Sequence, residues 1–83
     1  MGKAVPPLLG EGLLVRRITV HPKEVLLVRA HLEAREGLAN LFAEQGGDLT
    51  LATTSEQLHK LDCFLKDLHD EMPIWGPDAP RAH

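Results

Sequence analysis

Proline and glycine residues divide this chain into short segments, and their positions constrain the fold more than any other feature of the sequence. Pro22 stands where a helix can begin, Gly37 where that helix can end, and Pro73 where a second helix must end. Between the two helices, Gly46 and Gly47 separate two apolar runs, which is typical of a β-hairpin. With a strand before Pro22, the breaks predict the order strand, helix, strand, strand, helix.

The residues between these breaks agree with that order. Residues 13–20 are rich in branched apolar side chains and predict a strand, and residues 38–44 and 48–53 predict the two arms of the hairpin. Good helix formers fill residues 22–36, and residues 56–72 predict the second helix. Five apolar side chains at helical spacing form the stripe of the second helix: Leu58, Leu61, Leu65, Leu68 and Met72. Ser55 is its expected N-cap.

This order, β-α-β-β-α, predicts a single α+β domain of the ferredoxin-like, split βαβ type. Its helices lie on one face of a three-stranded sheet, which has room for a fourth strand. A chain of 83 residues has room for one such domain. We expect residues 13–72 to form it, and residues 1–12 and 73–83 to be N-terminal and C-terminal arms. Because the fourth strand is absent, the strand over residues 13–20 is an edge, to be covered by an arm or by a second copy.

The first helix has apolar side chains on more sides than one sheet can cover. Val25, Val28 and Leu32 form its core stripe, and four further apolar residues lie elsewhere on the helix: Leu26, Leu27, Ala30 and Ala34. We therefore predict a homodimer. The alternative is that an arm covers Leu26 and Leu27, with Trp75 folding back.

Charge and cysteine content exclude several classes of partner. The net charge is −3, so we expect no nucleic-acid partner, and the arginines are expected to pair with carboxylates. No apolar run approaches the length of a membrane span, and the N-terminal residues do not form a signal peptide, so we expect no membrane partner. The single cysteine, Cys63, cannot form an internal disulfide, which favours a cytoplasmic location.

One pair of side chains has the chemistry of a metal or thiol site. His59 and Cys63 are four residues apart, so they share one side of the second helix, and imidazole and thiolate are zinc ligands. Two ligands do not make a site, and the pair lies opposite the leucine stripe. We therefore expect a solvated face with an ordinary thiol, no metal, no cofactor and no catalytic residues.

Two strings carry a family resemblance: Pro-Lys-Glu-Val-Leu-Leu-Val at residues 22–28, and Leu-Glu-Ala-Arg-Glu-Gly-Leu-Ala at residues 32–39. With the closing helix, they make residues 20–72 resemble a small bacterial domain family of unknown function with a ferredoxin-like, ACT-like plan. The resemblance implies a fold and no activity, because the family has no established functional residues to carry over.

The leading hypothesis is a non-enzymatic, self-associating module that binds a protein partner or a small metabolite, as ACT-like domains bind ligands at subunit interfaces. The expected ligand positions are the turns at the two ends of the first helix, at His21 and Pro22 and at Gly37 and Leu38. The alternative hypothesis is a small metal-dependent or thiol-dependent enzyme centred on His59 and Cys63.

Overall fold

Three strands form one sheet in which each strand pairs antiparallel with its neighbour. The structure is a computed structural model that describes residues 13–80. β1 (Leu13–Thr19) pairs along its whole length with β3 (Asp48–Thr54), and β2 (Asn40–Ala43) pairs with the other side of β3. The strand order is therefore β1-β3-β2, with the last strand in sequence at the centre.

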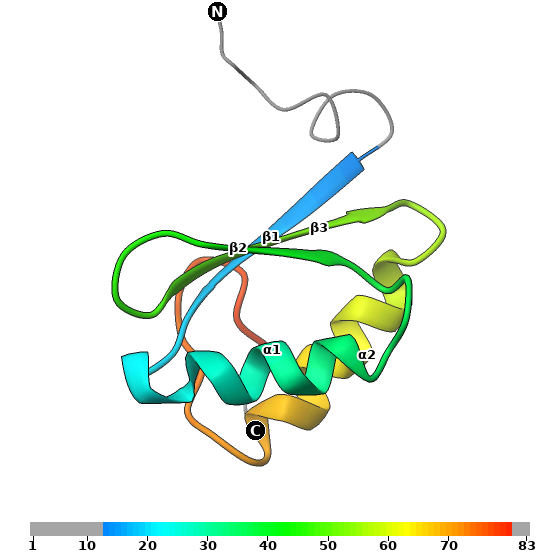
Figure 1. Ribbon diagram of the computed structural model, residues 1–83. Helices are drawn as coiled ribbons and strands as arrows, with labels where there is room; N and C mark the ends of the chain where they lie inside the picture. Colours follow the sequence, from blue (N-terminus) through cyan, green and yellow to red (C-terminus); the bar gives the residue numbers. More distant parts are fainter. Residues whose placement is uncertain (1–12, 81–83) are drawn as a thin grey trace, which may run out of the picture.

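Both predicted helices are present, and both lie on the same face of the sheet (Figure 1). The first begins at Pro22 with a short 3₁₀ turn, η2 (Pro22–Glu24), and continues as α1 (Val25–Glu33). The second is α2 (Leu58–His69). The small α+β fold predicted from the sequence is thus confirmed in its content of helices and strands.

The helices are shorter than the sequence predicted, because residues at their ends form turns. After α1, the N–H of Arg35 donates to the carbonyl of Leu32, and the chain reverses at Gly37, which has a φ of 78°. That left-handed conformation is the one expected of a glycine at a helix end. The prediction that Ser55 caps α2 is wrong. A turn over residues 55–57 follows β3, and the N-cap residue of α2 is Gln57, with no side-chain capping hydrogen bond. Within that turn the Thr54 hydroxyl accepts a hydrogen bond from the Gln57 N–H at 3.3 Å.

The core lies between the sheet and the two helices. Its buried side chains come from every layer of the fold: Ile18, Val20, Val28, Leu32, Leu38, Leu49, Leu51, Leu61, Phe64, Leu65, Leu68, Met72 and Ile74. The predicted stripe of α2 is confirmed apart from Leu58, which is only half-buried, and Phe64 is buried in addition.

The hairpin between β2 and β3 is held against the end of β1 by a close backbone contact. The Val20 N–H donates to the carbonyl of Gly47 at 3.0 Å. A Cβ atom at Gly47 would lie 1.6 Å from the Val20 carbonyl oxygen, so no other residue fits there without moving the backbone. Gly47 therefore fixes the position of the β2–β3 hairpin relative to Val20, the residue that follows β1.

The segment after α2 runs along the outer edge of β1 (Figure 1). Ile74 is 4% exposed and belongs to the core, and Trp75 forms an antiparallel bridge with Thr19. Further along, the Asp78 N–H donates to the Arg17 carbonyl at 3.0 Å. An arm of the chain thus covers the second half of this edge. Within residues 13–80, nothing bonds to the outward backbone groups of Val15. The expected arm over residues 1–12 lies outside the described residues.

Candidate functional site

The side of α1 that faces away from the sheet carries exposed apolar side chains. Leu26 is 75% exposed and Leu27 is 43% exposed, and Ala30 and Ala34 beside them are exposed as well. Leu26, Ala30 and Ala34 are spaced four residues apart, so they form one row along the helix. We call these four residues the outer α1 face. The described part of the C-terminal arm leaves it open, because that segment is bonded to β1 instead.

The second helix provides an internal comparison. The outward side of α2 carries exposed polar or charged side chains, as a solvated helix should: His59, Lys60, Lys66, Asp67 and Asp70. Both helices pack on the same sheet, yet only α1 presents leucines outward. Outward-facing leucines therefore distinguish α1 from α2.

The two expected ligand positions lie at opposite ends of α1, and the structure does not bring them together within one copy. At the first end, the His21 ring stands edge-on to the ring of Trp75, with centroids 5.0 Å apart. Pro22 lies beside the hairpin glycine Gly46. His21 and Pro22 are exposed, and their nearest neighbours give them a packing role at this corner.

At the second end, Gly37 borders an open groove of about 450 Å³ between the end of α1 and β2. Its charged lining consists of Arg29, Glu33, Arg35 and Glu36. Leu38 is buried, and its carbonyl accepts a hydrogen bond from the Thr53 hydroxyl at 2.7 Å. The corner thus offers a ligand both charge signs beside Gly37, while the Leu38 side chain belongs to the core.

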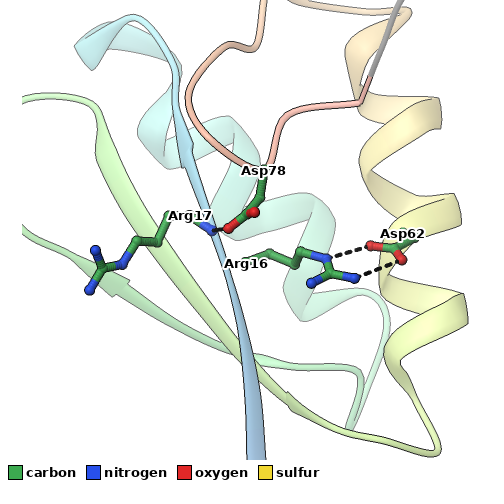
Figure 2. A network of polar contacts seen from close by, with 4 residues as sticks. All are labelled: Arg16, Arg17, Asp62 and Asp78. Carbon is green, nitrogen blue, oxygen red and sulfur yellow. Dashed lines mark hydrogen bonds and ion pairs between the residues drawn. The ribbon is translucent and has the colours of Figure 1, made fainter.

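A second groove, of about 530 Å³, lies between β1, α2 and the C-terminal segment. Figure 2 shows its polar network: Arg16 donates from Nε and Nη2 to the two carboxylate oxygens of Asp62, at 2.9 and 3.2 Å. Asp78 accepts from the Arg17 N–H at 2.7 Å. The expectation that the arginines pair with carboxylates is confirmed for Arg16.

The Arg16–Asp62 pair shifts the titration of both groups. Its hydrogen bonds lower the pKa of the Asp62 carboxyl below the ordinary value, and its partial burial opposes this. The same hydrogen bonds raise the pKa of Arg16. Both groups therefore stay charged at neutral pH and neutralise each other. The pair joins the sheet to α2, which is a structural role.

His59 and Cys63 point toward each other on the exposed side of α2 and also border this groove. The Cys63 Sγ lies 3.7 Å from the His59 Nε2. The nearby carboxylate of Asp62 is held by Arg16. Among the residues from 13 to 80, no three histidine, cysteine or acidic side chains are grouped closely enough to hold a metal ion.

Comparisons with known proteins give no assignment. No protein-family model matches the chain, and neither a curated protein nor a solved structure matches it. The described helices are also too short or too polar to cross a membrane.

Proposed function

We propose that this chain is a non-enzymatic module of the cytoplasm that associates with itself to form a homodimer and binds a protein partner or a small metabolite. The observation that carries the proposal is the outer α1 face, with Leu26 three-quarters exposed while the matching side of α2 is polar. Fully burying a leucine side chain is worth about 1.5–3 kcal/mol, so two copies gain by covering each other's leucines.

The proposal includes a ferredoxin-like, ACT-like plan. The observed order of elements, with β3 between β1 and β2, supports it. Trp75 pairs antiparallel with β1 at the place where a fourth strand of that plan would pair, which also supports it. Fold similarity alone does not assign a function, so the surface observation remains the basis of the proposal.

Sedimentation equilibrium of the wild-type chain tests self-association. We expect the contact between two short helices to bury less than the roughly 1,200–2,000 Å² of a stable interface, and therefore to give a weak dimer with a dissociation constant in the micromolar range. The expected result is a mass that rises with concentration from 9.2 kDa toward twice that value. A mass of 9.2 kDa at every concentration through the micromolar range would refute the proposal.

For the ligand, the groove beside Gly37 is the first place to test. Its mixture of arginines and glutamates suits a small molecule that carries both charge signs. A thermal-shift screen of amino acids and nucleotides should find a compound that raises the melting temperature of the wild type and not of Arg29→Ala. Stabilisation that Arg29→Ala leaves intact would place the ligand elsewhere.

One observation favours the metal- or thiol-dependent enzyme, namely the 3.7 Å contact between Cys63 and His59. A zinc titration of the wild type and of Cys63→Ser decides between the two functions. We expect equal, weak affinities, because two ligands do not close a zinc site. A large loss of affinity in Cys63→Ser would favour the enzyme instead.

A further inference from the structure

We propose that the occupant of the outer α1 face is the same face of a second copy, packed antiparallel about a two-fold axis. This inference rests on the proposed self-association and names its surface and geometry. A two-fold axis makes each copy contribute the same residues, so the face must be complementary to itself. Two independent properties of the face, side-chain size and charge, meet that condition in the antiparallel orientation alone.

The first property is side-chain size. The large residues, Leu26 and Leu27, lie at the beginning of α1, and the small residues, Ala30 and Ala34, lie toward its end. Antiparallel packing places the leucines of each copy over the alanines of the other. The large side chains of one helix then fill the space that the small side chains of its partner leave. Parallel packing would oppose leucine to leucine and leave a gap between the alanines.

The second property is charge. Lys23 lies three residues before Leu26, and Glu33 lies three residues after Ala30, so a cation and an anion stand at opposite ends of the same face. Both are exposed, and among residues 13–80 neither takes part in an ion pair. Antiparallel packing brings Lys23 of each copy next to Glu33 of the other. Parallel packing would bring like charges together.

The arrangement also relates the two expected ligand positions. Within one copy, His21 and Pro22 lie at the opposite end of α1 from Gly37 and Leu38. In an antiparallel pair, the beginning of α1 in one copy lies beside the end of α1 in the other. The groove at Gly37, which Glu33 also borders, would then be bounded by both copies.

Charge reversal tests the orientation directly. We expect Lys23→Glu and Glu33→Lys each to weaken the dimer about tenfold in sedimentation equilibrium, because each turns two attractive contacts into repulsive ones. The double variant restores both attractions and should return to wild-type affinity. Each reversal puts the charge that the helix dipole favours at its end of the helix, so the monomer should stay folded by circular dichroism. Lys60→Glu, on the polar side of α2, is the matched control and should leave the affinity unchanged.

The possible outcomes separate this inference from the proposed function. If the wild type dimerises and both single reversals leave its affinity unchanged, antiparallel packing on α1 is refuted and self-association is not. The same conclusion follows if the single reversals weaken the dimer and the double variant does not restore its affinity. A dimer that survives Leu26→Glu would exclude the outer α1 face altogether. A wild type that is monomeric at every concentration would refute the proposed function and this inference together.

Discussion

Thr19 and Trp75 exchange two backbone hydrogen bonds, from the Thr19 N–H to the Trp75 carbonyl at 2.7 Å and from the Trp75 N–H to the Thr19 carbonyl at 3.0 Å. The pair closes the end of β1 that leads into the helices. Edge strands with open backbone groups are sites of unwanted association, and here the chain covers half of its own edge. Self-association through α1 therefore does not need this end of β1.

Hydrogen exchange should distinguish the two halves of that edge. The Thr19 amide, bonded to Trp75, is expected to exchange slowly, and the Val15 amide, which has no partner among residues 13–80, is expected to exchange quickly. Exchange measured by NMR at low protein concentration checks this. Equal protection at the two positions would show that something also covers the first half of β1.

Two glycines should respond very differently to alanine. Gly47→Ala is expected to cost about 2–4 kcal/mol of the free energy of unfolding, because its Cβ would overlap the Val20 carbonyl. Gly37→Ala should cost only about 1–2 kcal/mol, the price of a left-handed conformation with open space around it. Urea unfolding of both variants gives the comparison. A Gly47→Ala loss as small as that of Gly37→Ala would contradict the close contact at Val20.

The sequence predicted the elements well, because proline, glycine and apolar spacing are local signals. These signals predicted the end of the first helix at Gly37 and the hairpin turn at the two adjacent glycines. It did not predict that Gly47 packs against Val20 or that Trp75 pairs with Thr19, since these contacts join segments far apart in the chain. The Ser55 prediction failed because a turn over residues 55–57 follows β3, so α2 begins three residues after Ser55.

The ion pair between Arg16 and Asp62 predicts a pH dependence of stability. The lowered pKa means that folded Asp62 binds a proton less readily than the unfolded chain does. The pair therefore stabilises the fold fully above the ordinary carboxyl pKa of 3.8, and the contribution is lost as the pH falls through the lowered value. Because Asp62 is 41% exposed, screening by solvent keeps this contribution to about 1 kcal/mol or less.

Unfolding of Asp62→Asn against the wild type measures this contribution. The difference in unfolding free energy should be largest at neutral pH and shrink with added salt. It should begin to fall as the pH drops below 3.8 and vanish below the lowered pKa of folded Asp62. If the difference in unfolding free energy between the two proteins grew as the pH fell, the ion pair would not be stabilising the charged form of Asp62.

The candidate surface was partly visible in the sequence. The apolar residues outside the core stripe of α1 were identified by helical spacing, and the structure leaves Leu26 and Leu27 exposed. The ion pair and the two grooves were not found, because a groove depends on how separate elements meet. Arg16 and Asp62 are 46 positions apart, and no local pattern relates them.

The most direct test of the central claim is an NMR experiment on a mixture of isotope-labelled and unlabelled protein, recorded at a concentration where the dimer is populated. Filtered spectra then report only contacts between copies. The antiparallel pair predicts contacts from the Leu26 and Leu27 methyl groups of one copy to the Ala30 and Ala34 methyl groups of the other. Contacts between copies that involve β1 or α2 and none of these four residues would contradict the account, as would their complete absence.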